Sequence, residues 1–541
     1  MTPLKLDQFE GIYPRVSPSL LADRAAVAAE WCDFGYGELR SMKDGFLLRT
    51  LAAAATSLFS EDGVQFYAWP QDVNTAISPL LSGASADRLY YTDGSDFRHA
   101  ARSGATTNPT TPGTSYRVGV PRPSVAPTIG LSSAPPAGSA DLESRAYLYT
   151  YVNIFGEEGP PSPAVGVDVL TTTGVTVYFT IDSFASYAPI KEVRIYRTQS
   201  GGTTATFYYA TTFGAIGATG AQAVGDGVSA ALLNEPLAST NYYAPAPNLQ
   251  GLMALGNGIL AAWTGNTMFF CEPYKPWAWP PQNVVTFNFP IVGAMPHGTG
   301  ALVTTRGAPA LVSGVSSDAM TQTPLDVPHA GVSKWALVDL AGVAAYATND
   351  GIVLVSGTSA SITLSERYFT REVWRTRYAA GLSSMQFAFY DGKLLVFSRA
   401  GLFTPFMLKL DEAQGSMSDL PGFVAATSLV LVTSDGLYYL VGANLYQFGG
   451  GAAHALYWKS RELVLATPGN FGIARALCIG TFTIRFYADG VLRHTQVVTS
   501  ADLTFRLPSG FTALRWQIDI AGTGTFRELR IADTGRALAL I

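Results

Sequence analysis

The amino-acid sequence predicts an all-β protein: a β-propeller of six or seven blades, a β-sandwich inserted into it, and a second β-sandwich at the C-terminal end. Short runs in which apolar and polar residues alternate recur along the chain, and this period is typical of half-buried strands. Two-residue turns join pairs of apolar runs at a nearly constant interval, as in successive propeller blades. Only 14% of the 541 residues are charged, against about 25% in ordinary soluble domains. Large buried subunit interfaces are therefore expected.

Residues 1–115 are expected to form a helix, a loop and the first propeller strands. The Ala-rich run from Leu20 to Trp31 predicts a helix, with Ser17 or Ser19 as its N-cap. Two later runs rich in aromatic residues predict strands, the second of which leads into a turn at Asp93-Gly94. These runs are Gly63–Trp69 and Asp87–Thr92.

Residues 121–240 are expected to form the inserted β-sandwich. The segment Ala101–Pro127, which overlaps their start, is rich in Thr, Pro, Gly and Ser and is interpreted as a linker. Beyond it, short strands at intervals of roughly 10 to 20 residues predict a fibronectin III/Ig-like β-sandwich. The clearest strand has tyrosines at every second position, and a turn at Gly156–Pro161 follows it: Tyr147, Tyr149 and Tyr151. Further strand-like runs are Val175–Ile181, Glu192–Arg197 and Ala205–Ala210.

Residues 245–450 contain the repeated unit of the propeller, an apolar strand, a two-residue turn and a second apolar strand. The first residues of successive turns are 49, 44, 41 and 44 positions apart: Asn257-Gly258, Arg306-Gly307, Asp350-Gly351, Asp391-Gly392 and Asp435-Gly436. Asn-Gly and Asp-Gly suit type I′ turns, because both central residues have positive φ. Five units do not close a ring, so hairpins at Asp62-Gly63 and near Asp93-Gly94 are expected to supply earlier blades. Strands from both chain ends would then close the ring.

Residues 455–541 lose the repeat and predict the second β-sandwich. A hairpin with alternating faces surrounds the turn at Asp489-Gly490, and two further alternating runs follow it. The expected strands are Phe482–Tyr487, Leu492–Val497, Leu514–Ile520 and Phe526–Ile531.

Signatures of catalysis and of metal binding are missing from the sequence. The five histidines and three cysteines are scattered, without the spacing of a metal site or a disulfide framework. Gly256–Ala261 has the glycines of a dinucleotide fingerprint, but a strand-like run follows it and favours a hairpin. Asp93-Gly-Ser-Asp96 lacks the remaining ligands of a calcium loop, which favours a turn. We expect no enzyme activity, no cofactor and no metal, although carboxylates paired from distant positions stay an open alternative.

The sequence also predicts where the protein is made. No run of 18 apolar residues suggests membrane insertion. The first ten residues have no apolar core of a signal peptide. We expect synthesis and retention in a reducing cytoplasm.

The densest charge cluster, Glu366–Arg377, contains arginines interleaved with aromatic residues. Three of these arginines are four positions apart and would share one helix face. That face could contact a nucleic-acid backbone. Alternatively, the cluster forms a short inter-blade helix or a subunit contact whose arginines pair with neighbouring acids. The candidate residues for a subunit interface or a DNA channel are Arg367, Arg371, Trp374, Arg375 and Arg377.

Several phrases of the sequence together indicate a resemblance. They are Phe9–Pro18, Gly37–Arg40, Arg145–Val152, Gly156–Pro163, Phe369–Trp374, Tyr457–Ser460 and Asn470–Gly472. With these phrases, in all four stretches, the chain resembles the tail nozzle, or tail tubular protein B, family of short-tailed bacteriophages. None of the phrases is a catalytic signature.

The resemblance implies a structural virion protein of the phage tail, assembled in the host cytoplasm. Six copies would form a homo-hexameric ring below the tail adaptor (head-to-tail connector) protein. Tail fibre proteins would attach to it, and DNA would pass through its lumen without sequence-specific binding. The formal net charge of −5 agrees, because an acidic lumen repels phosphate and lets DNA slide. The alternatives are a receptor- or glycan-binding tail protein (an adhesin) and, third, a polysaccharide-degrading propeller enzyme.

Overall fold

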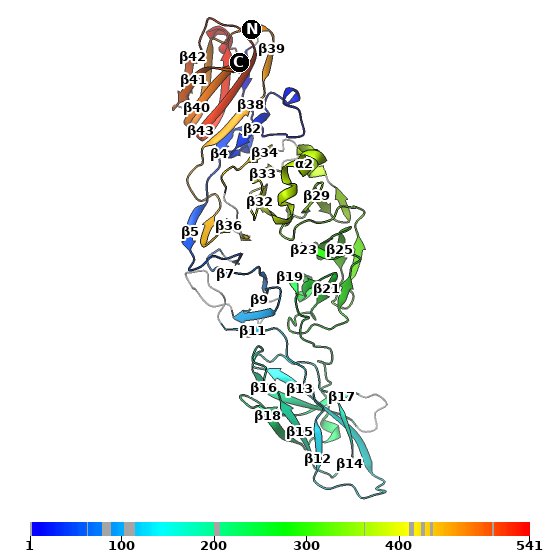
Figure 1. The fold of residues 1–541 in the computed structure, drawn as a ribbon. Coiled ribbons are helices and arrows are strands. Elements are labelled where there is room, and N and C mark those ends of the chain that lie inside the picture. The colour runs from blue at the N-terminus through cyan, green and yellow to red at the C-terminus, as the bar shows by residue number, and fades with distance from the viewer. Residues whose placement is uncertain are drawn as a thin grey trace.

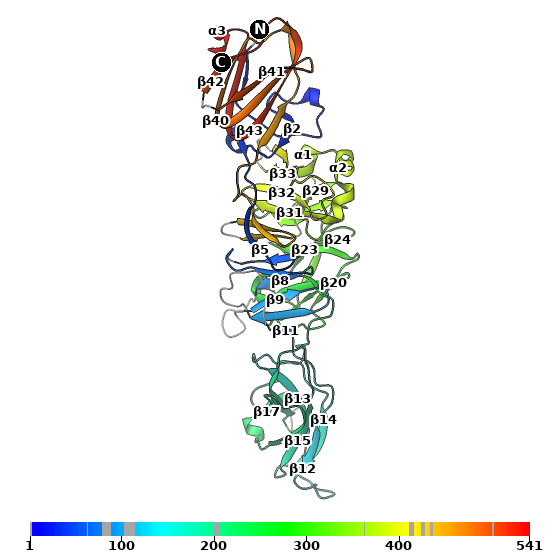
Figure 2. The same cartoon turned by 60° about the vertical axis from the view of Figure 1, so that its left-hand side comes forward.

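A computed structural model describes residues 3–61, 63–77, 88–101, 114–199, 206–361, 363–410, 416–423, 428–432, 436–499 and 502–540. Strands account for 51% of the structure and helices for 7%, which confirms the all-β class. Three bodies lie in line in Figures 1 and 2: a C-terminal sheet near both chain ends, a ring of sheets in the middle, and a sandwich at the far end. Over the described ranges, no helix has the length and apolarity needed to cross a membrane.

The ring consists of groups of four antiparallel strands arranged around a common centre (Figure 1); five groups are separate sheets, and β31–β34 belongs to a larger sheet. The first three are β8 (Asn74–Ile77), β9 (Arg88–Thr92), β10 (Phe97–Ala101) and β11 (Ser115–Arg117); β19 (Gln250–Ala254), β20 (Leu260–Thr264), β21 (Thr267–Phe270) and β22 (Val284–Thr286); and β23 (Ile291–His297), β24 (Gly300–Thr305), β25 (Ala310–Ser313) and β26 (Thr321–Pro324). The next three are β27 (Leu337–Asp339), β28 (Ala344–Thr348), β29 (Gly351–Ser356) and β30 (Ser359–Ser361); β31 (Met385–Tyr390), β32 (Lys393–Ser398), β33 (Phe406–Lys409) and β34 (Ser416–Asp419); and β35 (Ser428–Val432), β36 (Gly436–Val441) and β37 (Asn444–Gln447) with β5 (Phe46–Thr50).

Successive sheets of the ring share hydrophobic cores, so apolar burial holds the ring together. The short sheet β6 (Ser57–Phe59) and β7 (Tyr67–Trp69) lies between the last sheet and the first. On one side, Leu58 packs with Leu440 of β36. On the other, Trp69 packs with Tyr91 of β9, with ring centroids 5.4 Å apart. The packing therefore continues around the whole ring.

β5 joins the N-terminal part of the chain to the last sheet of the ring. It pairs antiparallel with β37, from Phe46 opposite Gln447 to Thr50 opposite Asn444. The fourth strand of this sheet thus comes from a segment almost 400 positions earlier in the sequence. Separation of the two segments would expose unpaired backbone on both.

Several of the expected tight turns have the backbone that Gly and Asn favour, whereas at Asp350-Gly351 only the glycine has positive φ. Asp391 and Gly392 have φ values of 52° and 70°, and Asn257 and Gly258 have 57° and 68°. Both pairs therefore match the positive φ of type I′ turns. The Asp62-Gly63 and Asp435-Gly436 turns each include a residue outside the described ranges.

The sandwich has two sheets with a shared core. One contains β12 (Thr128–Leu131), β15 (Val175–Ile181) and β18 (Gly220–Asp226); the other contains β14 (Val165–Leu170), β13 (Leu142–Asn153), β16 (Ile190–Thr198) and β17 (Phe207–Gly214). The alternating tyrosines of β13 point into this core, where they pack with Phe179 and other apolar side chains: Tyr147, Tyr149 and Tyr151. The alternation in the sequence therefore marks the buried face of the strand.

A buried ion pair connects the sandwich to the ring. The Arg88 guanidinium of β9 lies 2.7 Å from a carboxylate oxygen of Glu157, and both side chains are almost fully buried. Arg88 also lies over the Phe155 ring, 3.6 Å from its centroid. From the next sheet, the Trp277 indole donates to the carbonyl oxygen of Glu158 over 3.2 Å. These contacts fix the orientation of the sandwich on the ring.

The C-terminal region differs from the predicted separate sandwich. Its long strands belong to one 14-stranded sheet that continues through β2 and β34 into a sheet of the ring. The members outside the ring are β1 (Leu4–Leu6), β2 (Ala26–Glu30), β3 (Cys32–Asp33), β4 (Leu39–Ser41), β38 (Leu456–Ser460), β39 (Leu463–Gly469), β40 (Ile473–Ala488), β41 (Val491–Val498), β42 (Asp502–Arg506) and β43 (Ala513–Ala532). The continuity arises because N-terminal strands pair with C-terminal ones, a contact that no local pattern encodes.

The predicted helix from Leu20 to Trp31 is wrong. A single 3-10 turn is followed by β2, which pairs antiparallel with β38 from Ala26 opposite Ser460 to Glu30 opposite Tyr457. The helix propensity of alanine is weak compared with the hydrogen bonds of a complete sheet. The 3-10 turns are η1 (Pro18–Leu20), η2 (Gly35–Gly37), η3 (Ala230–Leu232), η4 (Gly256–Gly258) and η5 (Ala379–Ser384), and a short helix, α3 (Gly535–Leu538), follows β43.

The segment interpreted as a linker, Ala101–Pro127, is structured in part. Ala101 ends β10, and β11 pairs with β10 from Ser115 opposite Ala100 to Arg117 opposite Arg98. Residues 102–113 lie outside the described ranges. Despite its polar composition, this segment therefore contributes β11, the edge strand of a ring sheet.

Candidate functional site

The arginine cluster lies on two short helices, α1 (Thr363–Tyr368) and α2 (Arg371–Tyr378). The Thr370 hydroxyl accepts a hydrogen bond from the Val373 amide over 3.2 Å and caps the start of α2. This break places Arg367 on a different helix from Arg371 and Arg375. The spacing of the three arginines suggested one continuous helix face, but they do not share one.

Trp374 is unsuited to contact DNA or a neighbouring subunit. Its side chain is fully buried and its indole donates to the Thr348 carbonyl oxygen over 3.1 Å. Aromatic rings surround it, with the Tyr378 centroid 4.8 Å away. Its inclusion among the surface candidates is corrected, because the aromatic side of α2 is the side that packs into the core.

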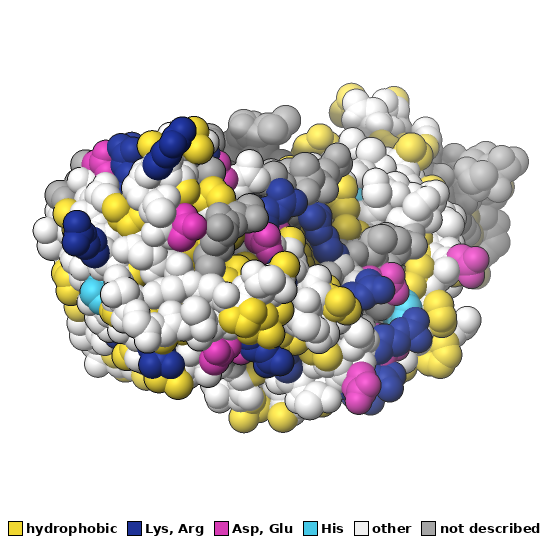
Figure 3. All heavy atoms as spheres, turned by 90° about the horizontal axis from the view of Figure 1, so that it is seen from above, with side chains coloured by type: hydrophobic (Ala, Val, Ile, Leu, Met, Phe, Trp, Pro, Cys, Tyr) yellow, Lys and Arg dark blue, Asp and Glu magenta, His cyan; other side chains and the backbone are white. Residues whose placement is uncertain are grey.

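The remaining arginines of α2 lie at the surface, and two of them have acidic partners. Arg375 donates to Asp350 over 2.9 Å, and Arg377 lies 3.4 Å from Asp419. Arg371 is exposed. Seen from above the C-terminal sheet, basic and acidic side chains are interspersed and form no basic stripe (Figure 3). The geometry thus agrees with arginines paired to neighbouring acids.

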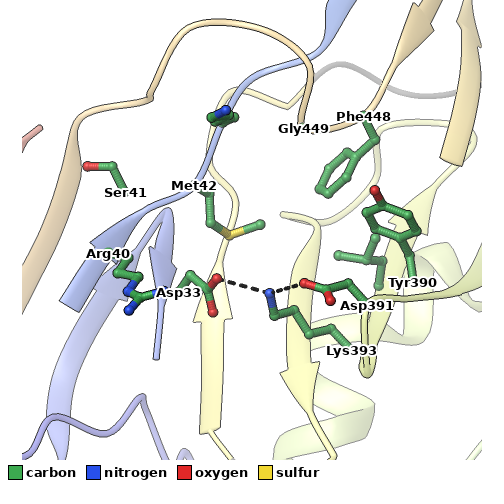
Figure 4. Close-up of a pocket in the computed structure, with 11 residues that line it drawn as sticks. Asp33, Arg40, Ser41, Met42, Tyr390, Asp391, Lys393, Phe448 and Gly449 are labelled. Atoms are coloured by element: carbon green, nitrogen blue, oxygen red, sulfur yellow. Dashed lines mark hydrogen bonds and ion pairs between the residues drawn. The ribbon is translucent and has the colours of Figure 1, made fainter. Parts of the chain in front are cut away.

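A pocket lies where the C-terminal sheet meets the ring (Figure 4). It is a cavity of about 280 Å³. One wall comes from β3 and β4 and the opposite wall from the turn between β31 and β32. Phe448, next to Gly449 after β37, adds an apolar surface. The lining residues are Asp33, Arg40, Ser41, Met42, Lys43, Tyr390, Asp391, Lys393, Leu395, Phe448 and Gly449.

Lys393 connects the two walls of this pocket. Its ammonium nitrogen lies 3.0 Å from Asp33 and 3.0 Å from Asp391 (Figure 4). Burial disfavours the charged amine, but the two carboxylates outweigh burial and raise the pKa of Lys393 above its ordinary value. The amine is therefore held as a cation that binds the C-terminal sheet to the ring.

The opposite side of the pocket is aromatic. The Tyr390 and Phe448 rings are perpendicular to each other, with centroids 6.2 Å apart. A charged wall facing an aromatic one could hold a small polar group, but both carboxylates are already paired with Lys393. The pocket therefore acts first as a joint between two bodies.

In the described part of the chain, no group of three or more His, Cys, Asp or Glu side chains could hold a metal ion. Burial raises the pKa of the Cys271 thiol to about 12 and also raises that of Cys32, so both thiols stay neutral. The Asp93 carboxylate accepts a hydrogen bond from the Asp96 amide over 2.8 Å, which confirms a turn at Asp93–Asp96.

Asp33 and Lys393 were not among the residues that the sequence singled out, and Asp391 was noted only as part of a turn. Asp33 and Lys393 are 360 positions apart, so no spacing pattern could have joined them. The turn at Asp391-Gly392 was the one available signal.

Comparison with known proteins places the chain in no family. No protein-family model and no curated protein matches the sequence. Among solved structures, PorZ, a bacterial surface component of the type-IX secretion system of Porphyromonas gingivalis, has a TM-score of 0.28 at 9% identity. The match covers 86% of this chain and 48% of PorZ, so the chain spans about half of PorZ's length.

Two other similar structures are of proteins that act on or bind sugars. The exo-beta-1,3-galactanase from Phanerochaete chrysosporium has a TM-score of 0.16 at 10% identity, covering 85% of this chain and 100% of the galactanase. The Trypanosoma rangeli sialidase in complex with sialic acid has a TM-score of 0.21 at 8% identity, covering 99% and 97%. At scores this low, the likenesses carry no argument about function.

Proposed function

We propose that the protein is a structural subunit of a phage tail nozzle, assembled in the host cytoplasm as a homo-hexameric ring and resident in the virion tail. In this role it has no catalytic site and no cofactor. Its partners are the tail adaptor, tail fibre proteins and DNA that passes through the lumen. The resemblance of the sequence phrases to the nozzle family motivates the proposal, and the architecture supports it.

The observation that carries the proposal is the interleaving of the two chain ends. β1, β2 and β4 pair with strands of the C-terminal region, and β5 pairs with β37 of the ring. The C-terminal sheet also joins the ring directly, because Glu30 of β2 pairs with Asp419 of β34, so separating the two bodies breaks this backbone pairing. A subunit that transmits load along its length needs such continuity.

We also propose that the ring is a β-propeller with an inserted sandwich. Six four-stranded sheets are its full blades, and the β6–β7 sheet is a seventh, incomplete one. The sandwich enters between β11 and β19, after the first full blade. β5 supplies the closing strand of the last blade, which leaves few open sheet edges.

Exposed apolar side chains on the C-terminal sheet support assembly with other copies. Apolar side chains exposed to water become more stable when another copy covers them, and few charged residues are expected at the centre of an interface. The exposed residues on its strands include Val464, Ile479, Val491, Leu492, Val497 and Leu514.

Light scattering and negative-stain images of the purified full chain test the proposal. A hexamer has about 344 kDa, from six copies of 57.4 kDa, and should appear as a closed ring with a central channel. Leu492→Lys, at a side chain 49% exposed on β41, should shift the population toward monomer. Leu402→Lys, at a side chain 53% exposed on the ring, is the matched control and should leave the hexamer intact. A protein that stays monomeric, or forms a free trimer, contradicts the proposal.

A glycan-binding tail protein is the second candidate. One surface favours it, the uncharged outer face of the sheet β12–β15–β18, where the Tyr178 side chain is 50% exposed. Neither candidate excludes the other, because this face lies on the sandwich, at the end farthest from the chain termini (Figure 1).

A further inference from the structure

The outer face of the three-stranded sheet of the sandwich has an unusual composition. β15 is its central strand, with β12 on one side and β18 on the other. Along β15, Val175, Val177, Phe179 and Ile181 point into the core. The residues between them therefore point outward, and they are Thr176, Tyr178 and Thr180.

Small residues flank this row on both sides. On β12, Gly130 pairs with Thr176, and on β18, Ala221 and Ala223 pair with Thr180 and Tyr178. The central strand thus stands above its neighbours. A groove of about 560 Å³ runs over the face, and its nine lining residues include no charged side chain: Val125, Ala126, Thr128, Tyr178, Phe179, Thr180, Ala221, Gln222 and Ala223.

The Tyr178 ring lies close against the sheet. A Cβ atom added at Gly130 would be 2.8 Å from Cε2 of this ring, so the absence of a side chain at position 130 lets the ring lie over the strand. One side of the ring is covered by the backbone of β12, and the side chain as a whole is 50% exposed. The ring is thus a fixed platform beside a row of threonine hydroxyls.

These features indicate the chemistry of the occupant. An aromatic ring with an accessible face and a fixed orientation can pack against the C–H groups of a sugar ring, while hydroxyl and amide groups bond to sugar hydroxyls. The lack of charge disfavours nucleic acid and anionic ligands. The face is also small, about 14 Å across three strands. Its area falls well below the about 800 Å² per partner of a stable protein interface, which disfavours a second copy.

We propose that this face binds a neutral saccharide chain, with Tyr178 as the stacking platform and the Thr128 and Thr180 hydroxyls as hydrogen-bonding groups. The inference rests on the second candidate function and not on ring assembly. Because no charges line the groove, binding should be insensitive to salt between about 50 mM and about 500 mM.

Affinity electrophoresis of the full chain in gels containing dextran, laminarin, a β-galactan or a mannan tests the proposal. At least one of these neutral polysaccharides should retard the wild-type protein, and heparin should not. Tyr178→Ala should weaken the retardation about tenfold, the factor that corresponds to the loss of one aromatic contact. Tyr178→Phe keeps the ring and should stay within about twofold of wild type.

Gly130→Val and Tyr274→Ala sharpen the test. A side chain at position 130 should displace the Tyr178 ring and weaken binding without touching any hydrogen-bonding group. Tyr274 also lies over a glycine, Gly258, and is 44% exposed, but on the ring. Its replacement is the matched control and should leave binding unchanged.

Three results would overturn the proposal: no retardation by any of the four neutral polysaccharides, retardation unchanged in Tyr178→Ala, or self-association that this substitution abolishes. Light scattering on the same variants separates this failure from failure of the ring proposal. Tyr178→Ala should leave the oligomeric state unchanged, whereas Leu492→Lys should alter the oligomeric state and leave retardation intact.

Discussion

Acidification from pH 7 to pH 5 should destabilise the ring at His99. This residue lies on β10 and is 2% exposed, and its Nε2 atom is buried without a hydrogen-bond partner. The Phe155 ring centroid is 5.4 Å from the His99 ring. Burial, followed by the positive charges of Arg88 and Arg98, lowers the pKa of His99 from 6.5 to about 3. The folded protein therefore keeps this imidazole neutral.

The sign and the size of the effect follow from linkage. Because the pKa is lower in the folded state, the unfolded chain binds the proton first as the pH falls below 6.5. The stabilisation by neutral His99 is fully present above pH 6.5 and is lost progressively toward pH 3. At pH 5, the pH lies about 1.5 units below the unfolded-state pKa of 6.5. Each unit corresponds to about 1.36 kcal/mol, so the loss of stability amounts to about 2 kcal/mol.

Urea unfolding at both pH values, followed by tryptophan fluorescence, measures this loss. Hydrogen exchange of peptides from residues 88–101 localises it. His99→Phe keeps an aromatic ring and removes the titrating group. Its loss of unfolding free energy between pH 7 and pH 5 should therefore be about 2 kcal/mol smaller than that of wild type. His297→Gln is the control and should behave like wild type. If His99→Phe loses as much stability as wild type, the reasoning is refuted.

Three substitutions test the packing described above. Glu157→Gln should lower the free energy of unfolding by about 3 kcal/mol in urea titrations, because the buried Arg88 loses its carboxylate partner. The double variant R88M/E157L should recover this stability. An unchanged urea midpoint in Glu157→Gln would contradict the role of the ion pair between sandwich and ring. Gly524→Ala should cost about 3 kcal/mol in thermal denaturation, since φ is +130° and a Cβ would lie 2.0 Å from the Ile479 carbonyl oxygen. Trp374→Ala should cost about 3–5 kcal/mol, whereas the exposed Arg371→Ala should change stability by less than about 0.5 kcal/mol; equal effects would argue against the burial of Trp374.

Local patterns were sufficient to predict many of the strands and some of the tight turns. The alternating tyrosines of β13 point into the sandwich core, and Asp391-Gly392 has the backbone of a type I′ turn. Both features depend on a few neighbouring residues. Side-chain alternation follows from the pleat of a strand, and turn type follows from which residues tolerate positive φ.

Features that depend on distant partners could not be predicted in the same way. The run from Leu20 to Trp31 has the composition of a helix, yet β2 forms because β38, more than 400 positions later, supplies its hydrogen-bond partners. The joint of Asp33 with Lys393 has the same origin. The break between α1 and α2 could have been anticipated, because Thr370 precedes a helix start and is a good N-cap.

The scarcity of charge has a structural counterpart in the positions of the ion pairs. Arg88 and Glu157 join the sandwich to the ring, Lys393 and Asp33 join the C-terminal sheet to the ring, and Lys334 and Asp72 join two separate sheets within the ring. Apolar contacts tolerate small slips between bodies, but a buried ion pair is satisfied in one arrangement and leaves an uncompensated charge in every other. Of these three pairs, Arg88–Glu157 is almost fully buried, and we infer that it sets the angle between the sandwich and the ring. A fixed angle between the sandwich and the ring is the property that the proposed ring of identical copies would require.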